Sequence, residues 1–327
     1  MRVVTKILCS MLMLVALVGC DQPAPAKHIG ILLHGESRIP LLNAFLQEMK
    51  TLGFSDGNNL SITTLNSNND PKQLVALTQQ LLTQPLDLLI AAGGLEAEEI
   101  KSQLEKSKAH TPVLVLSINS IIERKFVADR RNPGWNVTGI DNLNAELSSK
   151  RVELMLDLIP ALQRILILYQ PKLEPSVMGL QHARNEASQR GIQIVARAVT
   201  RSDEIRQAMA ALRPDDVDAM LLVPSALIDN ELKNVILPVT QRLNIPVMGH
   251  SRAMLPSGVV ASYGAPISEL SRQGARLAQK ILNGALASNH PFEVPTKYEY
   301  SVNKSALKSL GLELPALVRS QVTEIME

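Results

Sequence analysis

Short apolar runs without polar alternation recur along the chain, and segments with helical periodicity separate them. The first three runs are HIGILLHG (28–35), LDLLIAAGG (86–94) and PVLVLSIN (112–119). Runs of this length and character are typical of strands that are buried on both faces of a sheet. A helix that begins at Asn69-Asp70-Pro71 lies between the first two, and its leucines share one face. This alternation predicts a parallel sheet with helices on both faces.

The same alternation begins again after a less regular stretch that ends near residue 140. The strand-like runs of this second half are RILILYQ (164–170), IQIVARAV (192–199), DAMLLVPSA (218–226), IPVMGH (245–250) and GVVASYG (258–264). Two similar halves predict an α/β fold of two doubly wound parallel-sheet lobes. In such sheets ligands bind beyond the carboxyl ends of the strands, so two facing lobes predict a ligand cleft that closes by a hinge.

The first twenty residues differ from the rest of the chain. Arg2 and Lys6 precede an apolar run at 7–18, which has the length of a secretory signal and is short for a membrane-spanning helix. Leu17-Val18-Gly19-Cys20 then resembles a bacterial lipobox, a signal in which the chain is cut before the cysteine and the cysteine carries lipid. A signal-anchor helix with an incidental cysteine is the alternative interpretation.

We therefore predict a lipoprotein signal peptide at 1–19, lipidation of Cys20 and a tether at 20–27, whose prolines disfavour helix. Cys20 would attach the mature chain to a membrane. Asp21 beside it resembles the enterobacterial signal for retention at the inner membrane. We expect the protein at the periplasmic face of that membrane if the organism is Gram-negative.

Composition and charge exclude several classes of function. The chain has 327 residues, 46% of them hydrophobic and only 3% aromatic, which is enough for a large aliphatic core. Cys9 leaves with the signal and Cys20 is acylated, so no thiol remains for a disulfide, a metal site or a nucleophile. A net charge of +2 without basic runs predicts no nucleic-acid partner, and the six histidines lack the spacing of metal ligands.

Catalytic motifs are weak in this sequence. Ser301–Lys304 and Ser305–Lys308 have a serine–lysine spacing, but the SDN and KTG segments that accompany it in serine hydrolases are missing. The chain also lacks GxSxG, HExxH, P-loop and GxGxxG motifs. We predict that the protein is not an enzyme and uses no cofactor.

Four segments carry a family resemblance, and they occur in order over the mature chain. They are NPGWNVTGI (132–140), ELMLDLIPALQRILILYQP (153–171), GVVASYG with ELSRQGARLAQKILNG (258–264 and 269–284) and YSVNKSALKSLGLELP (300–315). Together they resemble the ABC-transporter substrate-binding proteins that include tryptophan- and tyrosine-binding lipoproteins, with the type I periplasmic-binding fold.

The resemblance implies that the chain crosses between the lobes three times. The first lobe would comprise 28–140 plus 265–288, and the second 141–263 plus 289–327. Gly139, Gly264 and the stretch around Pro291 are candidate flex points or plain turn formers. An ABC permease would be the partner, and we expect a monomer.

Candidate ligand-binding residues follow from the strand ends. In the first lobe they are His34, Glu36, Gly93, Gly94, Leu95, Ser117 and Asn119. In the second lobe they are Tyr169, Ser225, His250 and Tyr263. Gly93-Gly94 lies at a strand end before a helix and can present backbone N–H groups to a carboxylate. Mixed hydroxyl, amide and backbone groups suit a small polar molecule.

The chain departs from the family at this predicted cleft. Amino-acid binders of the family tend to carry an acid directly after the VP of the strand at 218–224, whereas here Ser225 follows and no acid occurs until Asp229. The first loop reads HGESRIP and lacks the usual His-Pro pattern. These departures count against an aromatic amino acid and leave an amino-acid-like or carboxylate-bearing solute.

Charged residues at the predicted cleft edge also leave room for an anionic ligand. They are His34, Arg38, His250 and Arg252, against Glu36 and Glu96. Two functions stay open at this point: a solute receptor of an ABC importer, and a periplasmic sensing subunit that signals to a membrane kinase or cyclase. Both would use the same fold.

Overall fold

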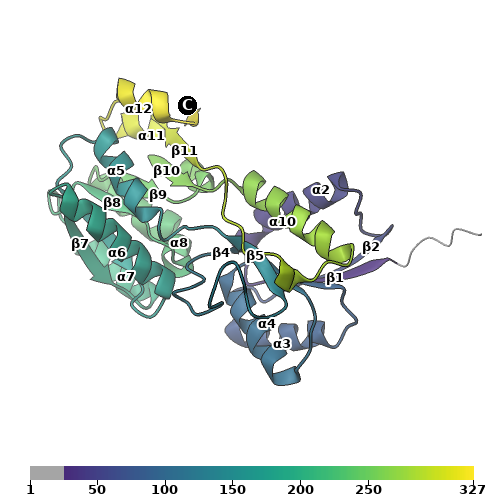
Figure 1. Ribbon diagram of the computed structural model, residues 1–327. Helices are drawn as coiled ribbons and strands as arrows, with labels where there is room; N and C mark the ends of the chain where they lie inside the picture. Colours follow the sequence, from purple (N-terminus) through teal and green to yellow (C-terminus); the bar gives the residue numbers. More distant parts are fainter. Residues whose placement is uncertain (1–25) are drawn as a thin grey trace, which may run out of the picture.

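Two β-sheets form the framework of the computed structural model, which describes residues 26–327 (Figure 1). The predicted signal peptide, Cys20 and all but the last two residues of the tether lie outside the described residues. No helix within the described part combines the length and apolar character needed to cross a bilayer.

The first lobe is built on five parallel strands in the order β2-β1-β3-β4-β5. Their bounds are β1 Lys27–Leu33, β2 Leu60–Asn66, β3 Leu88–Ala91, β4 Val113–Ile118 and β5 Val137–Asp141. One face is covered by α2 (Ile39–Thr51) and by α10 (Ile267–Leu282), which comes from late in the chain. The other face is covered by α3 (Pro71–Leu82) and α4 (Gly94–Ser107). A 3-10 turn, η2 (Glu36–Arg38), precedes α2.

The second lobe is built on seven strands in the order β12-β11-β10-β9-β8-β6-β7. Their bounds are β6 Arg164–Tyr169, β7 Gln193–Ala198, β8 Ala219–Leu221, β9 Val247–Gly249, β10 Ala261–Gly264, β11 Glu299–Asn303 and β12 Glu324–Met326. All neighbours pair in parallel except β10 and β11, which are antiparallel. The predicted class of two parallel-sheet α/β lobes is confirmed, and the antiparallel pair is an addition that the sequence did not predict.

Helices cover both faces of the second sheet as well. One face carries α5 (Ser148–Leu158), α6 (Glu174–Gln189), α11 (Lys304–Ser309) and α12 (Ala316–Gln321). The other carries α7 (Ser202–Ala210), α8 (Ala226–Asn230), the π-helical turn η3 (Leu232–Ile236) and α9 (Leu237–Arg242). Two 3-10 turns, η4 (Arg252–Ser257) and η5 (Ala287–Asn289), complete the regular elements.

Local sequence explains where several of these elements begin. The Asp70 carboxylate accepts a hydrogen bond from the Lys72 backbone N–H at 2.8 Å, and Pro71 occupies the first helical position of α3. Both features favour a helix start. Gly53 follows α2 with φ of 89°, a conformation that glycine adopts without strain. The predicted start of the helix at Asn69-Asp70-Pro71 and the end of α2 both follow from this chemistry.

Three segments connect the lobes, after β5, after β10 and before β11. The last of them first runs beside the first sheet. Thr138 Oγ1 donates to the Pro291 carbonyl at 3.1 Å, and the Asp141 N–H donates to the Glu293 carbonyl at 2.8 Å. Phe292 packs in the first lobe's core. The boundary at 288/289 stays a prediction, and these contacts favour a crossing a few residues later.

Candidate ligand-binding cleft

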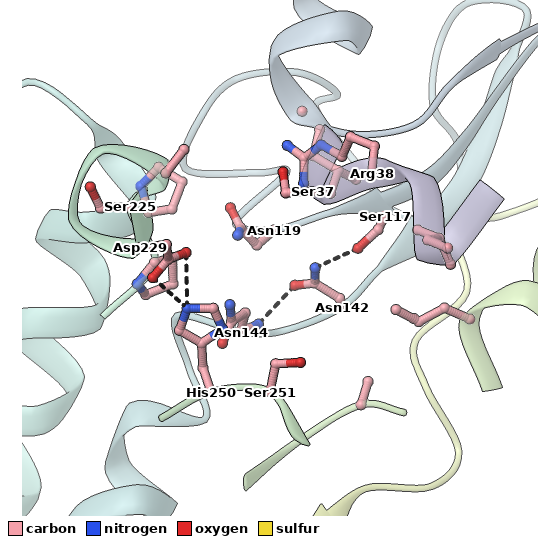
Figure 2. Close-up of a pocket in the computed structure, with 18 of the residues that line it drawn as sticks. Ser37, Arg38, Ser117, Asn119, Asn142, Asn144, Ser225, Asp229, His250 and Ser251 are labelled. Carbon is pink, nitrogen blue, oxygen red and sulfur yellow. Dashed lines mark hydrogen bonds and ion pairs between the residues drawn. The ribbon is translucent and has the colours of Figure 1, made fainter. Parts of the chain in front are cut away.

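A cleft of about 390 Å³ lies where the strand ends of the two sheets face each other (Figure 2). First-lobe residues that line it are Ser37, Arg38, Leu41, Gly94, Leu95, Ser117, Ile118, Asn119, Arg124, Ile267 and Leu270. The second lobe and the crossings contribute Asn142, Asn144, Leu147, Leu173, Pro175, Pro224, Ser225, Ala226, Asp229, Asn230, His250, Ser251, Ala253, Met254 and Ala265. None of these lining residues is Phe, Tyr or Trp.

The first-lobe wall contains an arginine that is held by a buried carboxylate. Arg38 Nε donates to Glu96 Oε1 at 3.2 Å, and the same oxygen accepts the His34 backbone N–H at 3.0 Å. The guanidinium lies against Gly93, where a Cβ atom would come within 2.5 Å of Arg38 Nη2. Glycine at 93 therefore leaves the space that Arg38 occupies.

A second arginine lies beside the next glycine. Arg124 Nε donates to Glu98 Oε1 at 2.9 Å, and Nη2 lies 2.7 Å from the same oxygen. A Cβ atom on Gly94 would lie 3.2 Å from Arg124 Nη2. Only 8% of the Arg124 side chain is exposed. Two guanidinium groups thus flank the start of α4, where free backbone N–H groups and the helix dipole also favour an anion.

Amides and a hydroxyl form the floor of the cleft near β4 and β5. Asn142 Nδ2 donates to Ser117 Oγ at 2.7 Å, and Asn142 Oδ1 accepts the Asn144 backbone N–H at 2.9 Å. Asn119 lies between Ser37 and the second lobe and points into the open space (Figure 2). These groups can donate and accept, so they suit the polar parts of a ligand.

The second-lobe wall carries a carboxylate that is held by a histidine. His250 Nε2 lies 3.1 Å from Asp229 Oδ1 and 3.2 Å from Oδ2, and 29% of the Asp229 side chain is exposed (Figure 2). Ser225 Oγ donates to Gln170 Oε1 at 2.6 Å and accepts the Ile228 backbone N–H at 3.3 Å. Asp229 follows Ser225 by one helical turn, through a bond from its N–H to the Ser225 carbonyl. Asp229 is therefore the first acid after Val223-Pro224, and it lies one turn into α8.

Six of the sequence-predicted site residues line this cleft, namely Gly94, Leu95, Ser117, Asn119, Ser225 and His250. Five lie outside the lining: His34, Glu36, Gly93, Tyr169 and Tyr263. His34 Nδ1 lies 2.7 Å from Ser67 Oγ, Gly93 is covered by Arg38, and Tyr169 packs on the second lobe's core. Tyr263 stacks on Tyr298 at 5.9 Å between ring centroids. Ligand contact stays a prediction for all eleven residues.

Sequence reasoning left Arg124, Asn142, Asn144 and Asp229 out of the candidate site. The two asparagines follow the end of β5, so the strand-end argument would have found them. Asp229 lies one turn inside a helix, and a spacing of four residues from Ser225 is its only signal. Arg124 comes from an irregular loop and gave no signal. Arg252, predicted at the cleft edge, pairs with Glu324 instead.

A fully buried arginine lies behind the second-lobe wall. Arg151 Nε donates to the Tyr263 carbonyl at 2.8 Å, and Nη1 donates to the Asn144 carbonyl at 2.8 Å. Its hydrogen-bond partners among the described residues are uncharged, and burial lowers the pKa of Arg151 to about 9. Asn144 and Tyr263 lie at two of the three crossings, so Arg151 joins two hinge segments to one helix.

A buried carboxylate ends the first lobe at the same hinge. Asp141 Oδ2 accepts from Arg130 Nε at 3.2 Å and from Nη2 at 2.5 Å. Burial raises the pKa of Asp141, and Arg130 opposes that effect only in part. Burial likewise raises the pKa of Glu146, with a smaller contribution from the nearby Asp141 charge. The hinge therefore holds two carboxyl groups whose pKa values burial raises above those of free carboxyl groups.

Comparison with known proteins gives a family match over almost the whole described chain. A family model described as ABC transporter substrate binding protein matches residues 28–326. A tyrosine-binding protein of Clostridioides difficile (strain R20291) is 22% identical over 290 residues, which are 88% of this chain and 81% of the relative.

Solved structures share the fold. A Streptococcus pneumoniae protein in complex with L-Trp has a TM-score of 0.83 and 22% identity, and the alignment covers 92% of this chain and 100% of the other. A conserved domain protein of Vibrio cholerae O1 biovar El Tor has a TM-score of 0.82 and 21% identity, with 92% and 99% covered.

Proposed function

This chain belongs to the family of ABC transporter substrate-binding proteins, and from that membership we propose that it is the lipid-anchored solute receptor of an ABC importer. Proteins of this family bind ligands without catalysing a reaction, and they work outside the cytoplasm. The solute we propose is small, polar and amino-acid-like, and it is trapped between the two lobes.

The observation that carries this proposal is the distribution of polar groups over both walls of the cleft. Gly94, Ser117 and Asn119 face it from the first lobe, and Ser225 and Asp229 from the second. A ligand that contacts both walls gains its full set of hydrogen bonds only when the lobes close. Binding therefore shifts the protein to a closed state that a permease can distinguish from the open one.

Opposite charges on the two walls support an amino-acid-like solute. The start of α4 with its arginines suits a carboxylate, and Asp229 on the other wall suits an ammonium group. The tyrosine-binding relative and the structure with L-Trp bind molecules of this class. The lining of this cleft has no Phe, Tyr or Trp side chain to stack on an aromatic ligand, which favours a different amino acid.

Ligand binding is tested with the soluble mature chain from Asp21 onward. Melting temperature should rise with the concentration of the cognate solute, because only the native state binds it. Small-angle scattering should give the mass of a monomer and a smaller radius of gyration with solute. If neither the melt nor the radius responds to any amino acid or organic acid, the receptor proposal is wrong.

Anchoring is tested at Cys20. Cys20→Ser should abolish incorporation of labelled fatty acid and release the mature chain from membranes or leave it unprocessed, without a change in melting temperature. Normal labelling of the serine variant would contradict the anchor. The importer role is tested by uptake of the cognate solute into cells that lack the chain, which should fall.

A further inference from the structure

We propose that the solute carries a second acidic group besides its amino-acid carboxylate, so that its class is an acidic amino acid. Arg38 and Arg124 of the first lobe would be the residues that determine this specificity. The inference rests on the proposed receptor function and makes the ligand class of the same cleft more specific.

The first-lobe wall presents positive charge to the cleft. Arg38 and Arg124 are the charged side chains that this wall contributes to the lining, whereas Glu96 and Glu98 stand outside the lining. The start of α4 alone can hold one carboxylate through its free N–H groups. Two further guanidinium groups at the same place exceed what a single carboxylate requires.

A glutamate orients each of the two arginines. Glu96 accepts a hydrogen bond from Arg38 Nε. Glu98 accepts one from Arg124 Nε and also forms an ion pair with Arg124 Nη2. No hydrogen bond to a described residue uses Arg38 Nη1, Arg38 Nη2 or Arg124 Nη1. The glutamates therefore hold each planar group on one side and leave donors free on another. Donors fixed in advance lose little entropy when a ligand binds, and a guanidinium suits a carboxylate.

The placement of Arg124 is unfavourable for the stability of the fold. Arg124 is almost fully buried, although its partner Glu98 is 43% exposed. Burying a cation against a solvent-exposed partner is a poor way to stabilise a fold. The Gly93-Gly94 pair, which leaves space for both guanidinium groups, further indicates that the wall is built around them. Glu98 compensates the Arg124 charge from its exposed side, and an anionic ligand group would add compensation from within the cleft.

The second-lobe wall distinguishes an acidic amino acid from a plain dicarboxylate. Asp229 faces the cleft there, and its carboxylate would repel a ligand that carries only negative charge. A ligand ammonium group would reverse that interaction. An acidic amino acid would direct its two carboxylates toward Arg38 and Arg124 of the first lobe and its ammonium group toward Asp229 of the second.

Glutamate and glutamine provide the test, because they have nearly the same shape and differ in one charge. Calorimetry with the mature chain should show glutamate or aspartate binding at least about tenfold more tightly than the matching amide, as expected for a hydrogen-bonded charge. Succinate, which lacks the ammonium group, should bind more weakly than either acid.

Arg124→Gln is the informative variant, because Glu98 is exposed and its loss of a partner leaves no buried charge. We expect a loss of roughly 10- to 150-fold for the acidic amino acid and about threefold or less for its amide. Arg124→Lys should recover only part of the loss, since lysine lacks the planar fork. The control is Arg201→Gln, which removes an arginine from an exposed ion pair with Asp203 and should change neither affinity.

Equal or tighter binding of the amides, or of tyrosine or tryptophan, would overturn the acidic class. Arg124→Gln with no effect, or with the same effect on acid and amide, would overturn the role of the arginines. In both cases closure on a neutral solute would leave the receptor function standing. Failure of the whole panel, acidic, neutral and aromatic, would count against both proposals.

Discussion

The two walls of the cleft occupy equivalent places in their lobes but carry opposite chemistry. In the first lobe, Arg38 and Arg124 lie against two glycines at the start of α4 and are held by glutamates. In the second lobe, Asp229 lies on α8 and is held by His250. Each wall is a helix start beyond the carboxyl end of a parallel strand. The fold thus determines where a ligand is held, and the residues after each strand determine its polarity.

The hinge behind the walls also carries opposite charges in the two lobes, but here the first lobe contributes the acid and the second lobe the cation. The first lobe ends in the buried carboxylate Asp141, which Arg130 partly neutralises. The second lobe holds the buried cation Arg151, whose described partners are uncharged carbonyl, amide and hydroxyl oxygens. An acid with a charged partner and a cation without one should respond differently to substitution and to pH.

The largest effect should come from removing the buried cation. Arg151→Met should lower the free energy of unfolding by about 3–5 kcal/mol, because each buried hydrogen bond lost costs about 1 kcal/mol or more and orphaned acceptors add to it. Urea unfolding measures the change. Arg190→Met, which breaks an exposed pair with Glu186, is the control and should have little effect. Equal midpoints for Arg151→Met and wild type would mean that Arg151 does not hold the hinge.

The next largest effect concerns Asp229 on the second wall. Asp229→Asn should weaken binding of a solute with an ammonium group by roughly 10- to 150-fold, as for loss of a charged hydrogen bond. Binding of the same solute without its amine should change much less or improve. Calorimetry with both solutes measures the difference, and Asp203→Asn on the exposed surface is the control. Equal losses for both solutes would place the ammonium elsewhere.

A smaller effect should appear in the pH dependence of stability. Burial raises the pKa of Asp141 and Glu146 in the folded state, so in the interval above their ordinary pKa the native protein binds more protons than the unfolded chain. Their contribution to stability is therefore greatest at low pH and is lost as pH rises through the raised pKa values. For each group, a difference of one unit between its folded and unfolded pKa changes the free energy of unfolding by about 1.4 kcal/mol.

Asp141→Asn isolates that contribution, because asparagine does not titrate. The difference in unfolding free energy between variant and wild type should shift in favour of the variant as pH rises from about 4. Chemical denaturation at several pH values measures it. Asp218→Asn should give the opposite trend, since its interactions with Arg164 and the Gln163 backbone N–H outweigh burial and lower its pKa. A pH-independent difference for Asp141→Asn would contradict the assignment.

Much of the fold and about half of the candidate site were predictable for one physical reason. Strands buried on both faces read as unbroken apolar runs, and the carboxyl ends of parallel strands meet at one edge. That argument found Gly94, Ser117 and Ser225. Tyr169 and Tyr263 also follow the strand pattern but lie outside the lining of the cleft, because Tyr169 packs on the second lobe's core and Tyr263 on Tyr298. Their contact with a ligand stays a prediction.

The rest depended on contacts that a linear pattern does not contain. Arg124 reaches Gly94 from an irregular loop, and the short strands β11 and β12 join the second sheet at its edge. Gly139 and Gly264 were expected to flex or turn, and the structure gives another reason for them. A Cβ atom would lie 2.4 Å from the Val115 carbonyl oxygen at Gly139 and 2.2 Å from the His250 carbonyl oxygen at Gly264.

The smallest effects should come from the two glycines of the first wall, and they separate its arginines. A Cβ atom on Gly93 would collide with Nη2, Cζ and Nε of Arg38, at 2.5, 2.6 and 2.8 Å, so the guanidinium group must shift to admit alanine. On Gly94 the Cβ atom would lie 3.2 Å from Arg124 Nη2, and a shift of a few tenths of an ångström relieves this close contact.

Gly94→Ala should therefore weaken binding by about threefold or less, a small part of one charged hydrogen bond. Gly93→Ala should weaken binding more and also lower the melting temperature slightly, because a shifted Arg38 compensates the buried Glu96 less well. Calorimetry and thermal melts of the two variants measure both quantities, and each variant is the control for the other. A larger loss of affinity or melting temperature for Gly94→Ala than for Gly93→Ala would contradict this prediction. It would mean that Arg124, and not Arg38, is the arginine that cannot shift.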